Sequence, residues 1–233
     1  EVAENIDADD KAVLTGKAWA LNDLNRKEES RILADQLFLR YPTNLHVMDL
    51  RETLRAEDMR RFVPEAWFSK EFDGATEYWL YGTVEIPYSP TFRPYVQFLR
   101  QETSQDVVGQ TLRADWDRVA LGFNWIVTPE ILWQQTLGFD YLDGGDVGSH
   151  TRLTWWPTDP LRISGVFDSF SLAIPLRARV HGVTGKTAAL DFNYLESDLR
   201  EYGLTAGSNW LSDNNVNPFG RLRYSRNVYN DPD

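Results

Sequence analysis

Apolar and polar residues alternate with a period of two along most of the chain after Phe62. Between Glu77 and Ile86, the even positions are Tyr, Leu, Gly, Val and Ile, and the odd positions are Glu, Trp, Tyr, Thr and Glu. This alternation predicts a β-strand with one apolar face and one mainly polar face. The pattern recurs often enough to predict roughly ten strands. Further copies cover residues 119–127, 131–141, 149–156, 161–168, 187–195, 199–211 and 219–229.

A helical pattern precedes the strands. Apolar residues recur at near-helical spacing over residues 10–40, with a polar break at residues 25–27, which predicts two antiparallel helices. Thr43 and Asn44 can cap a third helix, expected over about residues 45–60. The chain therefore divides by pattern into two unlike parts.

We expect residues 1–60 to form a helical segment and residues 61–233 to form the strands. A single helix pair cannot bury its own apolar face, so such pairs usually stack in series. The segment Trp19-Ala20-Leu21, followed by Ala34, Phe38 and Pro42, resembles the end of a tetratricopeptide repeat array. The alternative is a helical cap packed on the β-domain.

The connections between the predicted strands alternate in length. Tight turns are expected at residues 128–130, 157–160 and 196–198 because these are rich in turn-forming residues. Short turns at one end of the strands and longer loops at the other are typical of outer-membrane barrels, whose short turns are periplasmic. The helical segment precedes the first strand and should lie on that short-turn side. Longer links are expected at residues 101–115, 143–148, 169–182 and 212–218.

Tryptophans flank the predicted tight turns. Trp125 and Trp133 lie on either side of one turn, and Trp155 and Trp156 precede another. Tryptophan collects at membrane interfaces, where an amphipathic ring suits the headgroup layer. The predicted fold class is therefore mainly β: an antiparallel up-and-down transmembrane β-barrel, of which this chain supplies a part, preceded by a short tetratricopeptide-like segment. A soluble sandwich with tryptophans in its core is the alternative.

Composition narrows the classes of partner. The chain carries 24 Lys and Arg against 35 Asp and Glu, a net charge of −11. Duplex nucleic acid is therefore not an expected partner, because phosphate binding needs clustered cations. The chain has no cysteine, which excludes disulfides, thiolate catalysis and Cys-based zinc sites. No apolar run reaches the roughly 18 residues that would predict a transmembrane helix.

Motifs for catalysis or metal binding are missing from the sequence. His46, His150 and His181 lie in unrelated segments, without His-x-x-x-His spacing, and no nucleophile elbow or phosphate-binding glycine loop occurs. Asp143-Gly144-Gly145-Asp146 lacks the remaining spacing of a calcium loop. We expect no enzyme, no metal and no cofactor. A glycosidase or lipid-modifying barrel stays an alternative, because its carboxylate pair would leave no spacing signature.

Ile174 to Gly185, with the following hairpin to Trp210, resembles the PgaA/HmsH-like family of outer-membrane exporters of poly-N-acetylglucosamine. The likeness is most specific in the loop Pro175-Leu176-Arg177-Ala178. That family has periplasmic tetratricopeptide repeats followed by a large outer-membrane barrel, which matches the helix-then-strand order.

The resemblance implies a passive conduit in the bacterial outer membrane, with the helical part in the periplasm. A partly deacetylated polysaccharide would pass outward through an acidic lumen. Outer-membrane lipid and a periplasmic deacetylase are the other partners that it implies. The alternative function is that of a soluble carbohydrate-binding β-domain with a helical docking cap.

If the apolar face meets lipid, the opposite face lines the lumen. Carboxylates there would attract a polymer that carries ammonium groups, and aromatic rings can stack on sugars. The alternative is that the acids pair with Arg162, Arg221 and Arg223, which share their face. Strand parity selects Glu77, Trp79, Tyr81, Glu85, Asp140, Asp168, Asp191 and Glu201, with Asn124, Gln134, Asn193 and Asn209 beside them.

The predicted loop from Ser169 to Gly182 is both apolar and basic. It carries Arg177, Arg179 and His181. Such a loop can fold into the lumen as a constriction, as plugs and loops do in other barrels. It can equally be an ordered extracellular loop.

Overall fold

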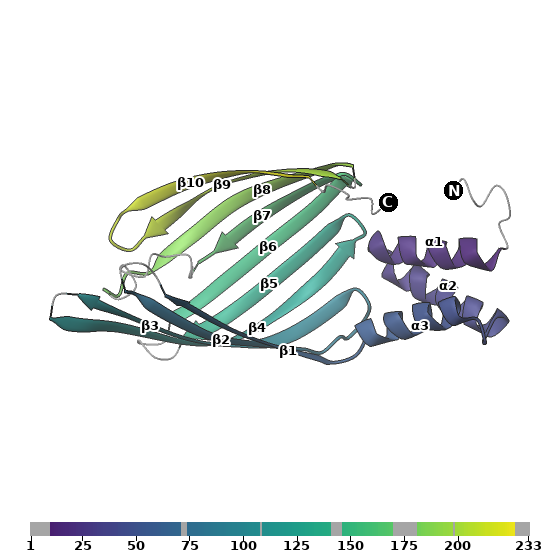
Figure 1. Ribbon diagram of the computed structural model, residues 1–233, viewed down its shortest axis with the longest axis horizontal. Helices are drawn as coiled ribbons and strands as arrows, with labels where there is room; N and C mark the ends of the chain where they lie inside the picture. Colours follow the sequence, from purple (N-terminus) through teal and green to yellow (C-terminus); the bar gives the residue numbers. More distant parts are fainter. Residues whose placement is uncertain are drawn as a thin grey trace, which may run out of the picture.

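The computed structural model consists of three helices followed by one curved sheet (Figure 1). The helices lie together beyond one end of the sheet. They are α1 (Lys11–Asp23), α2 (Lys27–Arg40) and α3 (Leu45–Glu57). The structure describes residues 10–70, 74–107, 109–140, 146–169, 181–197 and 199–226.

Short polar side chains lie at three helix boundaries, of which the sequence predicts those at Asn25 and Asn44. The Asp10 carboxylate accepts a hydrogen bond from the backbone N–H of Ala12 at 2.7 Å and caps α1. Asn25 adopts a left-handed φ of 59° in the polar break before α2. The Asn44 side chain accepts from the N–H of Val47 at 3.2 Å and caps α3. Among the described residues, no helix is both long and apolar enough to cross a membrane.

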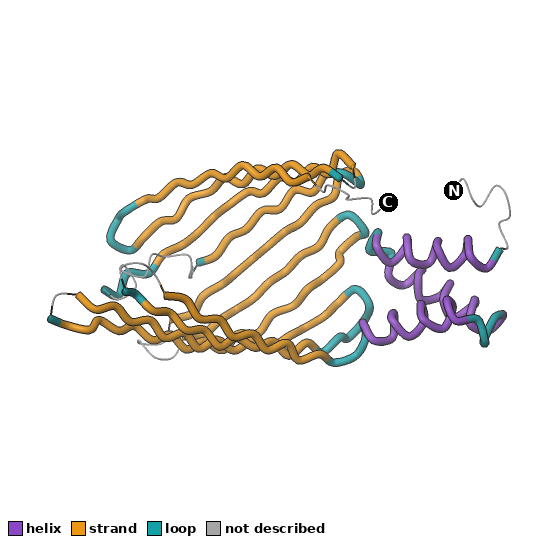
Figure 2. Tube along the Cα trace, viewed as in Figure 1, coloured by secondary structure: helices purple, strands orange, loops and turns teal. Residues whose placement is uncertain are grey.

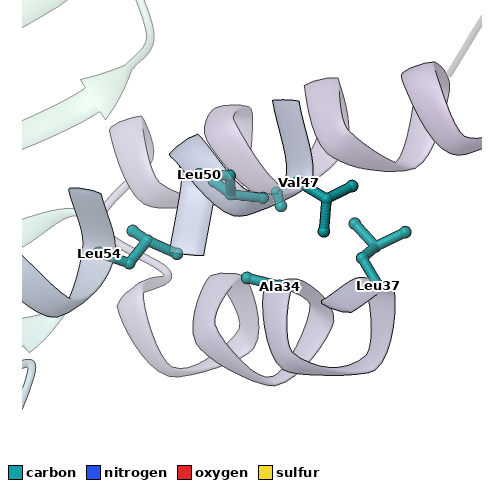
Figure 3. Packing of buried hydrophobic residues seen from close by; sticks show 6 residues of the cluster. Ala34, Leu37, Val47, Leu50 and Leu54 are labelled. Carbon is teal, nitrogen blue, oxygen red and sulfur yellow. The ribbon is translucent and has the colours of Figure 1, made fainter. Parts of the chain in front are cut away.

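The three helices share a small apolar core (Figure 3). Leu50 and Val47 of α3 face Ala34 and Leu37 of α2, and all four are buried. Three helices thus bury the face that a single pair would leave exposed. The rest of the core is formed by Ala18 and Leu54, with Leu14, Trp19, Leu33, Phe38 and Tyr41 packed around it.

The sheet is a ten-stranded antiparallel meander in which every strand pairs with its neighbours in sequence (Figure 2). This arrangement confirms the predicted up-and-down β-architecture. Within the described part of the chain, β1 and β10 are the two edges of the sheet. The strands are β1 (Arg61–Lys70), β2 (Thr76–Glu85), β3 (Phe92–Val107), β4 (Gln110–Thr128), β5 (Ile131–Asp140), β6 (Asp146–Thr158), β7 (Leu161–Asp168), β8 (Gly185–Ser197), β9 (Arg200–Leu211) and β10 (Val216–Arg226).

The tight turns β4–β5, β6–β7 and β8–β9 share one construction. In each hairpin the register shifts by one residue just before a two-residue connection. Such β-bulges bend the strand and increase its twist, and they are common at the rims of barrels. These three turns and the β2–β3 connection lie at the end of the sheet that faces the helices (Figure 2).

The two faces of the sheet have opposite character. Most of the large exposed hydrophobic side chains of the strands lie on one face, including the cross-strand partners Leu121 and Leu137, which are 64% and 57% exposed. The opposite face buries polar side chains such as Gln101, Thr103 and Thr187. An apolar exterior over a polar interior is the inverse of a soluble sandwich and is the pattern of a membrane barrel.

The segment from residues 101 to 115, expected to be a long loop, is instead paired strand. The ladder between β3 and β4 continues to Val107 opposite Gln110. The expectation is wrong because the alternation is lost there while backbone pairing continues. On the otherwise apolar face, Arg100 pairs with Asp117 at 3.0 Å, so this hairpin extends beyond the apolar band. The link expected at residues 212–218 is likewise shorter, since β10 begins at Val216.

A glycine on the polar face lets one side chain cross a whole strand. The ring of Tyr95 on β3 lies over Gly122 of β4, and its hydroxyl lies 2.7 Å from the hydroxyl oxygen of Thr136 on β5. A Cβ on Gly122 would lie 2.4 Å from the Tyr95 ring and 2.5 Å from the backbone oxygen of Gln135. Only glycine therefore allows this contact.

Replacing Gly122→Ala should destabilise the folded barrel by about 1–3 kcal/mol, because the backbone oxygen cannot move aside as a side chain can. Urea unfolding of the detergent-solubilised protein, followed by gel mobility, measures this. Gly165→Ala is the matched control, since a Cβ there meets only Leu190 Cδ2 at 3.6 Å. Equal stability of the two variants would show that a Cβ at position 122 causes no clash.

Candidate lumenal face

Strand register places all of the predicted lumen residues on the polar face. Tyr81 on β2 lies opposite Leu99, which lies opposite Arg118 and then Asp140 on β5. Directly paired residues point to the same side of a sheet, so such rows trace one face across the strands. The same tracing puts Glu77, Trp79, Glu85, Asn124, Gln134, Arg162, Asp168, Asp191, Asn193, Glu201, Asn209, Arg221 and Arg223 on this face.

The polar face is hollowed along its middle strands. A groove of about 400 Å³ crosses this face from β2 to β7. Its lining includes Tyr81, Tyr95, Arg118, His150 and Asp168. A groove that spans six strands on one face shows that the sheet is concave on the polar side.

The most enclosed charge pair of this face joins β4 to β5. The Arg118 guanidinium donates two hydrogen bonds to the Asp140 carboxylate, at 2.6 and 2.9 Å. Their side chains are 17% and 6% exposed. Bidentate pairing satisfies both groups and fixes their geometry, so Asp140 is held by the wall.

Two other predicted acids are also paired with arginines. Glu85 lies 2.8 Å from Arg61 on β1, and Glu201 lies 2.5 Å from Arg223 on β10. Arg223 also donates to Asn193 Oδ1 at 2.8 Å. Three of the predicted acids, Asp140, Glu85 and Glu201, are therefore paired with arginines on the same face.

The other predicted acids contact histidine, hydroxyl or amide groups. Asp168 lies 3.5 Å from His150 Nδ1. Asp191 accepts hydrogen bonds from Thr205 and Asn193, both at 2.7 Å. Glu77 accepts a hydrogen bond from the Gln101 amide. Neutral donors leave the charge of Asp191 in place, so this carboxylate remains a source of negative potential on the wall.

Two hydrogen bonds to side-chain amide oxygens complete this part of the face. Gln134 donates to Asn124 at 2.9 Å, and Thr187 donates to Asn209 at 2.6 Å.

The proposed constriction residues Arg177 and Arg179 lie outside the described residues, as does the loop Pro175-Leu176-Arg177-Ala178. Within the described residues, no group of three or more His, Cys, Asp or Glu side chains is placed to hold a metal ion.

Aromatic rings gather on the apolar face near the tight turns. Trp125 and Trp133, on either side of the β4–β5 turn, have ring centroids 6.1 Å apart, and Phe92 lies 6.4 Å from Trp125. Tyr202 and Tyr224 form a similar contact at 5.3 Å near the helix end of β9 and β10. This is the arrangement of an aromatic girdle at a membrane interface.

The helices contact the barrel at the same end. The Asn25 side chain donates to the backbone oxygen of Pro129 in the β4–β5 turn, at 3.2 Å. Glu57 at the end of α3 lies 3.7 Å from Arg93 of β3. The predicted position of the helical segment on the short-turn side agrees with these contacts.

Comparison with known proteins identifies the family. The model of the PgaA membrane β-barrel domain matches residues 112–233. The chain belongs to the PgaA membrane β-barrel family. This is a family of bacterial outer-membrane barrels and not of enzymes. The alternatives of a soluble carbohydrate-binding domain and of a glycosidase are therefore wrong.

The solved structure of a polysaccharide secretin supports the fold of this PgaA-family chain. A bacterial polysaccharide outer membrane secretin aligns with a TM-score of 0.58 and 19% identity, over 67% of this chain and 51% of that chain. The chain thus spans about half the length of that secretin. The outer membrane channel DcaP of Acinetobacter baumannii aligns with a TM-score of 0.43 and 12% identity, over 71% of this chain and 61% of that chain. A search of curated proteins finds no match.

Several partners of the predicted acids were not expected from the sequence. Arg61, Arg118 and His150 lie on the lumenal face of the PgaA-family sheet and contact Glu85, Asp140 and Asp168. The sequence shows which residues of one strand share a face. It does not show which residues of two neighbouring strands lie opposite each other, and that register brings these side chains together. Arg118 also lies one residue before the expected strand at residues 119–127, so it was not assigned to a face.

Removing Arg118 should lower the free energy of unfolding, because it leaves a buried carboxylate without its guanidinium partner. Arg118→Met should destabilise the barrel by about 3 kcal/mol because Asp140 stays enclosed without its partner, and Arg118→Met with Asp140→Leu should recover most of that loss. Arg200→Met removes the exposed pair with Glu196 and should cost less than about 1 kcal/mol. Urea unfolding in detergent compares the three, and equal losses would refute the enclosed pair.

Proposed function

We propose that the protein exports partly deacetylated poly-N-acetylglucosamine across the bacterial outer membrane. The observation that carries this proposal is the continuous polar, concave face of a PgaA-family sheet. The strands that carry this face run from the end of the sheet near the helices to the opposite end (Figure 1). A hydrated polysaccharide needs such a path, since its hydroxyl and amide groups cannot enter lipid.

The chemistry of the face suits passage rather than tight binding. Arginine partners reduce the field of Glu85, Asp140 and Glu201, whereas Asp191 keeps its charge among neutral donors. Conduction requires attraction strong enough to admit a substrate and weak enough to release it. A wall with mostly paired acids and few unpaired ones would slow an ammonium-bearing polymer without holding it. In this proposal the lumen is moderately acidic.

The helical segment would lie in the periplasm and meet the polymer first. Its contacts to Pro129 and Arg93 hold it against the short-turn rim, which is periplasmic in outer-membrane barrels. A tetratricopeptide-like role for residues 1–60 and a periplasmic deacetylase as partner belong to this proposal.

Deleting the gene should leave polymer in the periplasm, because no other path through the lipid exists for it. Immunoblots of periplasmic and secreted fractions with an antibody to the polymer measure the distribution. Complementation with the intact gene should restore secretion, and Asp191→Asn should restore it less efficiently. Unchanged secretion in the deletion strain would end the proposal.

The absence of native cysteine allows a clean test of orientation. Asp213→Cys, in the exposed β9–β10 turn, should react with a membrane-impermeant maleimide on intact cells. Leu39→Cys, on an exposed position of α2, should react only after the outer membrane is permeabilised. The unsubstituted protein is the blank. The reverse labelling pattern would contradict a periplasmic helical segment.

A further inference from the structure

Three tryptophans and a glutamine form one row across four neighbouring strands of the lumenal face. Trp67 of β1 lies opposite Trp79 of β2, which lies opposite Gln101 of β3 and then Trp116 of β4. Directly paired side chains are about 5 Å apart at their Cβ atoms, so the row is continuous. Trp79 is an expected lumen residue, but the proposed export function assigns no specific role to these aromatic side chains.

The rings are placed so that one remains accessible. Trp67 and Trp79 meet edge to face, with ring centroids 5.7 Å apart and an interplanar angle of 72°. Trp67 is 52% exposed, although it lies on the face that otherwise carries polar side chains. An exposed indole supported by a second indole is a rigid stacking surface with little side-chain entropy left to lose.

Two buried polar atoms in the row have no hydrogen-bond partner. They are Nε1 of Trp79, which is a donor, and Oε1 of Gln101, which is an acceptor. Gln101 is only 1% exposed, and its amide nitrogen is already used by Glu77. Buried groups of this kind are nearly always satisfied, so each needs a partner. Both atoms lie below the protein surface, so they mark unsatisfied polar positions within the row.

Carboxylates lie on both sides of the row. Glu65 precedes Trp67 by two residues on β1, and Glu77 precedes Trp79 by two residues on β2, so both share its face. The face of an indole ring attracts cations as a carboxylate does. Rings and acids together favour a pyranose that carries an ammonium group over one that carries a neutral acetamide.

The row lies toward the end of the sheet that is remote from the helices. Trp67 is near the end of β1, whose first residues adjoin α3. Gln101 and Trp116 directly adjoin Arg100 and Asp117, the ion pair on the opposite face where the apolar band ends. The row is therefore level with the outer boundary of the membrane and not with its middle.

We propose that Trp67, Trp79, Gln101 and Glu77 form a subsite for glucosamine units at the outer mouth of the channel. The proposal rests on the export function proposed above and specifies which units of the polymer the exit holds. The Trp67 ring stacks on the pyranose, Trp79 supports that ring, and Glu77, held by the Gln101 amide, attracts the ammonium group. Brief retention there would oppose backward slipping of the chain.

The test measures single-channel currents of the full-length protein in planar bilayers while oligomers of glucosamine, or of N-acetylglucosamine, are added from the outer side. Trp67→Ala should shorten the current blocks by glucosamine oligomers about two- to fivefold, the loss expected for an exposed cation–aromatic contact. Trp67→Phe should keep most of the block time. Glu77→Gln should shorten blocks by glucosamine oligomers only.

Trp210→Ala is the matched control, because this tryptophan is 44% exposed on the apolar face and should not alter the blocks. Folding of each variant is checked by its gel mobility before heating. If Trp67→Ala blocks as long as the unsubstituted channel, the subsite is refuted while the export function stands. If neither oligomer blocks the unsubstituted channel, the export function itself fails. Equal shortening for both oligomers in Glu77→Gln overturns the preference for ammonium.

Discussion

The structure depends on one constraint: in lipid, every backbone N–H and C=O must find its partner within the protein. A meander sheet meets this constraint for its inner strands, β2 to β9, by pairing each with both of its neighbours along the chain. Extended backbone sends successive side chains to opposite faces, so the same pairing that satisfies the backbone also separates lipid-facing from water-facing residues. The apolar exterior and the polar groove both follow from this geometry.

The polar face must satisfy its own side chains as well as meet a substrate. The pairs Arg118–Asp140 and Arg223–Glu201 stitch adjacent strands together, while Tyr95 reaches across a third strand. The wall is thus held by the groups that a passing polymer would touch. Under the proposed export function, the same pairing would limit the affinity for a cationic polymer, since a guanidinium partly neutralises the field of its carboxylate partner.

Local pattern predicted the helices, most of the strands and the face on which Glu77, Asp140 and Asp191 lie, because period and parity are properties of short segments. It did not predict the pairing of residues 101–107 with 110–116. The alternation of apolar and polar residues stops where a strand leaves the membrane, even though the strand itself continues. The partners of the acids required inter-strand register, which depends on long-range alignment. Whether Arg177 and Arg179 narrow the lumen is still a prediction, because they lie outside the described residues.

The three hairpins β4–β5, β6–β7 and β8–β9 repeat one unit: a bulge, a two-residue turn and a returning strand. Because the three hairpins share this turn construction, although their strands differ in length, we regard them as repeated units along the circumference. Duplicating or deleting one would change the bore by two strands while leaving the turn chemistry of the rim and the in-and-out parity of every other strand intact. Channel width in such a wall is therefore adjustable in whole hairpins, and gene duplication of about two dozen residues is a sufficient step.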